Sequence, residues 1–409
     1  MILLEDEING LSDEQIKSCL AKSISGRKLN RVLLIPPDIT RPSSGAGKIT
    51  SMYYDLLKNE RDAKVDILPA LGTHVPMTRA EQITFFGDII PESSFLVHDW
   101  RNGVKKIGEV PSDFVYDVSD GLINEAMDIE LSNYILDKSY DLILSIGQVV
   151  PHEVVGMANY TKNIVVGCGG SAFINKSHIL GAFYGMERIM GRDFSPVRKV
   201  FDYAEQHYLT KLPIEYVLTV TVTKEAKTDI LGLYISKNRD GFNKAVAMSQ
   251  RFNIIKLDKP IQTCFVFLDE KECRSTWLGN KAIYRTRMAM ANDGHLVVLA
   301  PGVEKFGEDE EIDRLIRKYG YVGRENILKL CKSNPELMGN LSAAAHLIHG
   351  STDGRFNVTY ATRHLGKNDI EGVGYDYLPY DEAIKECKQR KDVYIIDNPG
   401  LGLWMLQDL

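Results

Sequence analysis

The sequence lacks any closely spaced cysteine pair of the C-x-x-C type, because its six cysteines are scattered along 409 residues. Scattered cysteines fit reduced thiols better than a disulfide framework. No run of about 18 apolar residues occurs, so no membrane span is expected. The first residues lack a basic segment followed by a long apolar core, so no secretory signal is expected either. These absences together predict a cytoplasmic protein.

The chain also lacks an excess of positive charge, since its formal net charge is −6 at pH 7. Binding to nucleic acid requires a basic face, so no nucleic-acid partner is expected. Hydrophobic residues make up 44% and charged residues 25%, which is the composition of an ordinary globular enzyme. A chain of this length exceeds the roughly 250–300 residues at which one hydrophobic core stops growing, so two domains are expected.

Short apolar runs alternate with amphipathic stretches along the chain, and this alternation is typical of βα units. We predict an α/β fold of two α/β domains, 1–258 and 259–409, with the active site in the cleft between them. Strand-like runs are expected at 31–37, 64–72, 94–100, 141–150, 163–170, 261–269 and 295–302. Helices are expected at 49–61, 241–253, 280–293 and 308–320, and a hairpin at 216–223 and 229–236. We also expect a last strand at 392–400, and the sequence leaves open which of the two domains it joins.

Polar or glycine residues follow several of these apolar runs. In open α/β sheets ligands bind outside the carboxyl ends of the strands. We therefore expect five residues to converge on one crevice: Asp38, His74, His98, His152 and Gly167.

Four segments carry the side chains able to do chemistry: "PPDITRP" (36–42), "ALGTH" (70–74), "VVPHEVVGMANYTK" (149–162) and "GCGGSAFINKSH" (167–178). Two histidines suit acid and base catalysis on the two faces of a planar intermediate, because imidazole titrates near neutral pH. Arg41 is a bidentate donor for a carboxylate or phosphate, and Asp38 can orient either Arg41 or a histidine. Taken alone, each of these side chains also fits a structural role.

Together these segments resemble the nickel-pincer lactate racemase family, whose members isomerise 2-hydroxy acids by hydride transfer. The intervals carry the resemblance: Lys162 lies ten residues after His152, and His178 lies sixteen after Lys162. The resemblance implies a nickel-pincer nucleotide (pyridinium-3,5-bisthiocarboxylic acid mononucleotide nickel) attached covalently to Lys162, with nickel bound by His178. It also implies that His74 and His152 are the acid/base residues and that Asp38 supports one of them or Arg41.

The resemblance extends to binding of substrate and cofactor. The 2-hydroxy acid would bind Arg41 and Lys281, in a pocket that includes Trp277 and Trp100. Backbone and side-chain groups at two turns would contact the cofactor, namely Thr40, Gly169, Gly170 and Ser171. Cofactor-biosynthesis proteins would supply the nickel nucleotide.

Two positions depart from the family pattern. The family carries Ser-Gly-Gly-Arg before the lysine, whereas this chain has "ANYT" at 158–161. The glutamine of the family's Gln-x-x-Lys pair falls at Leu278. Because loss of one hydrogen-bonding group is costly for the matched substrate, we expect a 2-hydroxy acid other than lactate.

Two other functions stay open from the sequence. The segment "GCGGS" (167–171) is compatible with a hydrolase or transferase in which Cys168 is the nucleophile and His152 or His178 the base. A non-catalytic relative that binds a small molecule is the second. Nickel content distinguishes the racemase from both alternatives.

Overall fold

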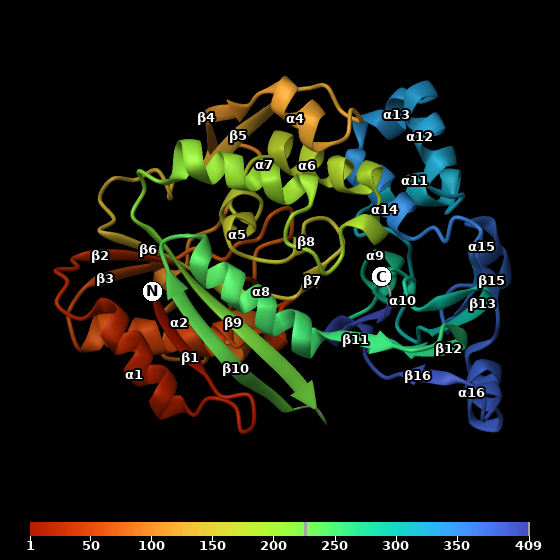
Figure 1. Cartoon of the computed structure of the whole chain (residues 1–409), viewed down its shortest axis with the longest axis horizontal. Coiled ribbons are helices and arrows are strands. Elements are labelled where there is room, and N and C mark those ends of the chain that lie inside the picture. The colour runs from red at the N-terminus through yellow and green to blue at the C-terminus, as the bar shows by residue number, and fades with distance from the viewer. Residues whose placement is uncertain (225–226, 408–409) are drawn as a thin grey trace. The chain divides into compact units, whose positions relative to one another are not determined.

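The computed structural model describes residues 1–224 and 227–407, and the chain divides into two compact units. The first unit comprises Met1–Ser177 and Gly191–Phe252, and the second comprises His178–Met190 and Asn253–Leu409 (Figure 1). The main boundary lies near the predicted one after residue 258. The segment His178–Met190, however, packs with the second unit although the prediction placed it in the first domain.

A six-stranded sheet, in the order β1-β10-β9-β6-β2-β3, organises the first unit. Its strands are β1 (Ile2–Glu5), β2 (Arg31–Ile35), β3 (Lys64–Ile67), β6 (Leu142–Gln148), β9 (Ile214–Lys224) and β10 (Lys227–Ser236). The neighbours β3, β2, β6 and β9 run parallel, whereas β9, β10 and β1 pair antiparallel, so the predicted hairpin at 216–236 is confirmed. Consequently β2, β3 and β6 present their carboxyl ends at the same edge of the sheet.

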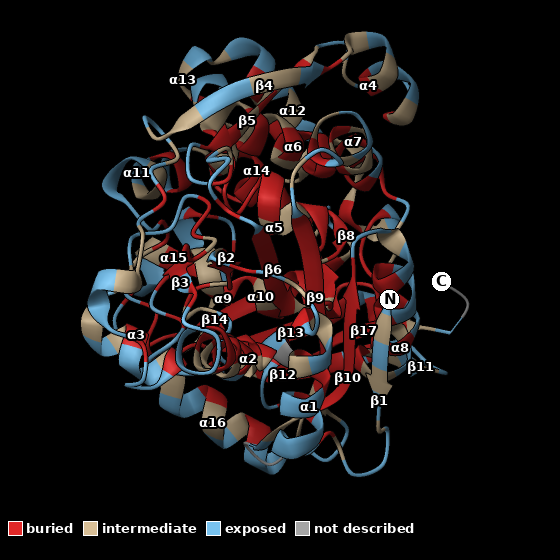
Figure 2. Ribbon diagram, turned by 90° about the vertical axis from the view of Figure 1, so that its left-hand side faces the viewer, coloured by how far each residue is buried: buried red, intermediate tan, exposed pale blue. Residues whose placement is uncertain are grey.

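Burial explains why the parallel strands are continuous apolar runs. Residues 32–35 of β2 are wholly buried, as expected of a strand covered on both faces, and Figure 2 shows β6 and β9 buried along most of their length. One face packs on α1 (Asp13–Ile24) and α2 (Ala46–Tyr54), whose Leu20, Ile49 and Tyr53 join the core. The predicted helix at 49–61 begins earlier, at Ala46, and its last turn, Asp55–Asn59, is π-helical.

Smaller elements complete the first unit. The strands are β4 (Val104–Val110) with β5 (Met127–Ser132), and β7 (Pro151–His152) with β8 (Gly156–Met157). The helices are α3 (Arg79–Phe86), α4 (Ser112–Val118), α5 (Thr161–Val165), α7 (Pro196–Ala204) and α8 (Arg239–Asn253). Helix α6 (Ser171–Tyr184) runs from the first unit into the second.

Two of the predicted strands are wrong. The run at 94–100 makes only an isolated bridge, between Phe95 and Ile67. The run at 163–170 forms most of α5 and the turn that follows it. The run at 163–170 is largely buried, and a short buried apolar segment has the same composition in a helix as in a strand, so periodicity does not separate the two. The run at 94–100 is not a buried segment, since Val97 is exposed.

A parallel five-stranded sheet, in the order β15-β14-β13-β12-β16, organises the second unit. Its strands are β12 (Ile261–Phe267), β13 (Met290–Leu299), β14 (Phe356–Ala361), β15 (Asp376–Tyr377) and β16 (Tyr394–Ile396), and β11 (Ile254–Leu257) pairs with β17 (Leu403–Leu406). The late predicted strand is therefore part of this sheet. The predicted helix at 280–293 is shorter, because α10 ends at Thr286 and β13 begins at Met290.

Eight helices of the second unit follow β12 in the chain: α9 (Thr276–Gly279), α10 (Lys281–Thr286), α11 (Glu310–Tyr319), α12 (Arg324–Ser333), α13 (Pro335–Gly339), α14 (Leu341–His349), α15 (Lys367–Gly372) and α16 (Tyr380–Gln389). Within residues 1–224 and 227–407, no helix combines the length and the apolar character needed to cross a bilayer.

Candidate functional site

Three segments that follow β2, β3 and β6 are tied together at the carboxyl edge of the first sheet. The Ala70 N–H donates to Pro36 O at 2.8 Å, and the Gly72 N–H donates to Gly167 O at 2.8 Å. The Asn163 amide donates to Ile35 O at 3.1 Å and so pins α5 to the end of β2. A Cβ at position 167 would lie 2.4 Å from the Asn163 carbonyl oxygen, so this junction requires glycine.

Asp38 and His74 form a hydrogen-bonded pair at this edge. His74 Nδ1 lies 2.6 Å from Asp38 Oδ2, and the Thr40 N–H and hydroxyl donate to Asp38 Oδ1 at 3.1 and 2.5 Å. Burial opposes ionisation of Asp38, but the interactions with His74, Thr40 and Arg41 outweigh it and lower the pKa of the carboxyl. Because an ionised carboxylate only accepts hydrogen bonds, the neutral His74 ring carries its proton on Nδ1 and a lone pair on Nε2. His74 is thus prepared to act as a base through Nε2.

Arg41 lies next to this pair and is exposed. Its guanidinium donates to Thr40 O at 3.1 Å and to Thr40 Oγ1 at 3.0 Å. Of the two partners predicted for Asp38, the structure therefore gives the direct contact to His74, while Thr40 links Asp38 to Arg41. An exposed guanidinium beside a base is suited to hold a carboxylate.

His152 occupies a small hairpin formed by β7 and β8 and is largely buried. The Val154 N–H donates to His152 Nδ1 at 3.1 Å, and Glu153 Oε2 lies 3.6 Å from the same nitrogen. In the neutral ring the proton is consequently on Nε2. The two histidines thus differ in the nitrogen that carries the proton.

Lys162 stands on the short helix α5 and is partly buried. Burial, together with the positive charges of Arg41 and Arg198, lowers its pKa to about 8, against the opposing effect of Glu153 and Asp38. An appreciable fraction of the amine is therefore neutral near physiological pH. A neutral amine is a nucleophile, whereas a solvated surface lysine stays protonated.

The glycines at 169 and 170 lie at the start of α6, where a cofactor contact was predicted together with Ser171. Here the Ala172 N–H donates to Glu130 Oε2 at 3.3 Å, and a Cβ at Gly170 would lie 2.1 Å from that oxygen. A carboxylate thus occupies the positive end of the helix dipole. A phosphate at these amides would require the Glu130 side chain to move away, and the cofactor contacts of Gly169, Gly170 and Ser171 stay predictions.

Cys168 is fully buried, and burial raises the pKa of its thiol well above the usual value. The thiolate is the nucleophilic form, so this side chain is a poor nucleophile. The geometry therefore argues against a hydrolase or transferase that uses Cys168. The other five cysteines are also unpaired and buried.

The remaining predicted site residues have partners close by. Trp100, in the first unit, lies under the Arg101 guanidinium, with the Arg101 Cζ 3.7 Å from the ring centroid. In the second unit, the Trp277 ring stacks on His346 with centroids 4.6 Å apart, and Lys281 Nζ lies 3.2 Å from Glu272 Oε1. His178, the predicted nickel ligand, is a partly buried residue of α6. In the part of the chain that the structure describes, no group of three or more His, Cys, Asp or Glu side chains is arranged to hold a metal ion.

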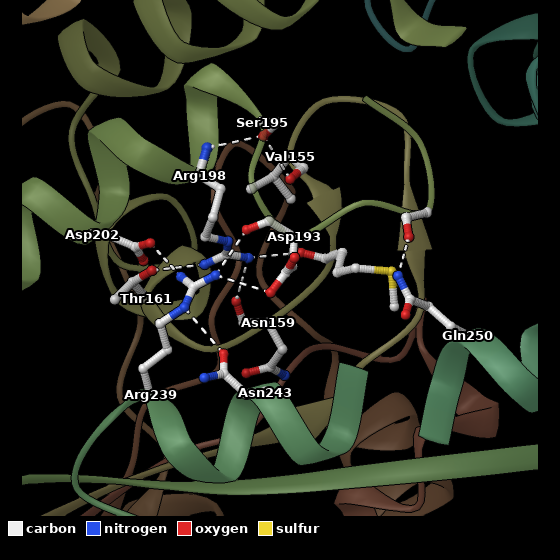
Figure 3. A network of polar contacts seen from close by, with 12 residues as sticks. Val155, Asn159, Thr161, Asp193, Ser195, Arg198, Asp202, Arg239, Asn243 and Gln250 are labelled. Carbon is white, nitrogen blue, oxygen red and sulfur yellow. Dashed lines mark hydrogen bonds and ion pairs between the residues drawn. The ribbon is translucent and has the colours of Figure 1, made fainter. Parts of the chain in front are cut away.

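Arg198 belongs to this region, although no pattern in the sequence predicted it as a site residue. It lies on α7, 36 residues after Lys162, and is completely buried. Its guanidinium contacts the segment just before Lys162, as Figure 3 shows. Glu153 was also missed, although it neighbours His152 in the chain and its charge reaches Lys162.

Part of this chain is similar in sequence to known proteins. Residues 7–189 match the family model described as the lactate racemase N-terminal domain. The chain is thus similar, in this part, to the N-terminal domain of lactate racemases. It is 26% identical over 182 residues to the lactate racemase of Thermoanaerobacterium thermosaccharolyticum, an alignment that covers 42% of this chain and 39% of that protein.

Two solved structures share the fold. The crystal structure of a protein from Thermotoga maritima has a TM-score of 0.86 and 24% identity, and the match covers 99% of this chain and 100% of that chain. The lactate racemase apoprotein from Thermoanaerobacterium thermosaccharolyticum has a TM-score of 0.72 and 16% identity, with 97% and 90% covered. The predicted α/β class is thereby confirmed.

Proposed function

We propose that this protein is a racemase or epimerase that inverts the 2-carbon of a 2-hydroxy acid with the help of a nickel-pincer nucleotide. The observation that carries the proposal is the arrangement at the carboxyl edge of the first sheet. A partly buried lysine with a lowered pKa lies within electrostatic reach of a hydrogen-bonded Asp38–His74 pair and of Arg41. The relationship to the lactate racemases supports assigning this arrangement to racemisation.

The residues present fit the cofactor at two points. The amine of Lys162 is neutral often enough near pH 8 that it would condense with a thioacid group of the nucleotide, giving a thioamide and releasing water. The imidazole of His178 would hold the nickel, because an imidazole nitrogen is a suitable ligand for this metal. When bound, the nucleotide supplies a reversible acceptor for the hydrogen of the substrate Cα. We do not assign its phosphate to the start of α6, because Glu130 lies there.

The chain's own residues then bind substrate and move protons. Arg41 binds the substrate carboxylate through its exposed guanidinium. His74 removes the hydroxyl proton through Nε2, and Asp38 holds the ring in that tautomer. His152 is the acid/base partner on the other face of the planar 2-keto acid, and its Nε2 carries the proton that it donates. The substrate roles of Lys281, Trp277 and Trp100 stay predictions.

Peptide mapping of the loaded protein tests the proposal. The chain is produced with and without cofactor-biosynthesis proteins, and tryptic peptides are compared by mass spectrometry. We expect a nucleotide-sized adduct on Lys162 only in the first preparation, and none in Lys162→Ala. Lys176→Ala, which changes a lysine on the nearby helix α6, is the matched control and should keep the adduct on Lys162.

Two outcomes would contradict the proposal. An adduct on a lysine other than Lys162 would overturn the assignment of the attachment site. A protein that takes up neither nickel nor nucleotide, yet binds small hydroxy acids, would instead be the non-catalytic relative.

A further inference from the structure

The segment that leads into Lys162 has an unusual backbone. Asn159 and Tyr160 have φ angles of 68° and 59°, and such left-handed values are rare for a residue as bulky as tyrosine. The Asn159 side chain lies so close to β6 that a Cβ at Gly147 would be 2.1 Å from its Nδ2. Two consecutive residues in this conformation persist only where the surroundings hold them.

Arg198 is the side chain that makes most of these holding contacts. Its Nη1 donates to Thr161 Oγ1 at 2.8 Å, and its Nη2 donates to Met157 O at 2.7 Å and to Asn159 O at 3.2 Å (Figure 3). The guanidinium thus fastens positions 157, 159 and 161, which alternate along the segment immediately before Lys162. A planar fork with several donors is suited to this task, because one rigid group satisfies three acceptors at once.

A second contact fixes the same segment from Tyr160. Its hydroxyl donates to Glu205, and its ring lies against Tyr216 and Phe242 with centroid distances of 4.3 and 5.0 Å. Burial raises the pKa of Glu205 to about 7.

Other charged residues lie near Arg198. Arg239 donates to Asp202 and, through Nη2, to Asp193 O at 2.8 Å (Figure 3). Asp202 and Asp193 in turn favour the charged form of Arg198, although burial lowers the pKa of that guanidinium to about 10. A buried cation is costly to a fold unless it is paired, so the burial of Arg198 is weak evidence for a stabilising role.

We propose that Arg198 is a positioning residue that fixes the backbone of 157–161 and thereby holds Lys162 where its amine reacts with the cofactor. The inference rests on the proposed attachment to Lys162 and deepens it. It also accounts for the departure from the family pattern, since "ANYT" at 158–161 supplies the threonine hydroxyl that Arg198 binds.

The test measures the reactivity of Lys162 in the full-length protein without cofactor, so that it does not depend on turnover. An amine-specific acylating reagent is applied from pH 7 to 10, and labelling of the Lys162 peptide is followed by mass spectrometry. Arg198→Met removes the whole contact, whereas Thr161→Val removes one acceptor and retains the shape and the nearby charge. Thr161→Ser restores the hydroxyl.

Arg287→Met is the matched control. Arg287 is an equally buried guanidinium of the second unit that donates to Ser351 O at 2.9 Å and to Glu187 and Asp353 at 3.0 Å each. Its loss destabilises the fold without touching the 157–161 segment. Circular dichroism of each variant establishes that it is folded.

We expect the midpoint of Lys162 labelling to rise by about one pH unit in Arg198→Met, which reduces labelling at pH 8 about fivefold. Thr161→Val should change it in the same direction by less, Thr161→Ser should resemble the unchanged protein, and Arg287→Met should have no effect. The inference is overturned if folded Arg198→Met, or Thr161→Val, labels at Lys162 like the unchanged protein. An adduct found elsewhere in the loaded protein would overturn the proposed function instead, which is a separate measurement.

Discussion

Replacing Lys162 by methionine should stabilise the first unit of the cofactor-free protein at neutral pH. Methionine has nearly the same length and volume as lysine but carries no charge into the partly buried site. The pKa of Lys162 falls from its ordinary value of 10.5 to about 8, with burial as the largest cause. The folded chain therefore holds the charged amine less favourably than the unfolded chain does.

The size and pH range of this effect follow from the two pKa values. The difference is about 2.5, and each unit corresponds to about 1.4 kcal/mol, which sets an upper limit of ~3 kcal/mol. Because Lys162 is only partly buried, solvent screening reduces the expected gain to about 1–2 kcal/mol. Between pH 8 and 10.5 the unfolded chain binds more protons than the folded chain, so the stability of the unchanged protein rises with pH in that range. The advantage of the variant is thus complete below pH 8 and disappears above about pH 10.5.

Tryptophan fluorescence offers a readout confined to the first unit. Trp100 lies in that unit, whereas Trp277 and Trp404 lie in the second. Substituting the latter two by phenylalanine leaves Trp100 as the reporter of urea unfolding at each pH. Lys176→Met is the control, because Lys176 donates to Ala126 O at 2.8 Å and pairs with Glu125, so its loss should bring no gain.

A Lys162→Met protein that is less stable than the parent at pH 7 would refute this reasoning. A gain that stays constant from pH 7 to 11 would do so as well, because it would come from packing and not from the buried charge. Confirmation would mean that the chain tolerates a destabilising amine for the sake of its reactivity.

Three further predictions concern the proposed activity. Asp38→Asn should lower kcat about 100-fold or more, because the amide no longer fixes the His74 tautomer that leaves Nε2 free to accept a proton. Steady-state kinetics on a folded, nickel-loaded variant measures this. His178→Ala should lose nickel while its circular dichroism is unchanged, and full metal retention would make His178 structural. Lactate should be a poor substrate compared with another 2-hydroxy acid, because Leu278 stands where a polar side chain is expected. Chiral chromatography of reactions in deuterated water should show inversion with the Cα hydrogen retained. Incorporation of deuterium at Cα would indicate carbanion chemistry instead.

The fold was predictable where local patterns and global packing agree. The alternation of apolar runs and helices indicated the α/β class, and the hairpin of β9 and β10 follows from two long strands joined by a short connection. Prediction failed at 163–170, where buried apolar residues form a helix and a turn, and at 94–100, where Val97 is exposed and only Phe95 makes a bridge. No periodicity in so short a run reveals that difference.

The candidate site was predictable where chemistry and position coincide. Asp38 and His74 follow adjacent strands, so parallel topology alone brings them to the same edge. The Glu130 carboxylate at the start of α6 was not predictable, because it comes from β5, and nothing in "GCGGS" indicates which side chain caps the helix. Glycines at a helix start indicate close approach, but they do not identify the group that approaches.

Arg198 illustrates why supporting residues escape sequence reasoning. Two of its three acceptors are backbone carbonyls, which any residue type offers, and the third is the hydroxyl of Thr161. The segment at 157–161 therefore contains no clear signature of its partner. The observation that marks this segment is a mismatch between residue type and backbone conformation. The segment "ANY" has no glycine, yet residues 159 and 160 have positive φ angles. Local preference and structure disagree there, and such disagreements concentrate where function requires a particular geometry. Arg198, which holds this backbone conformation, is thus the residue we expect to determine the position of the Lys162 amine.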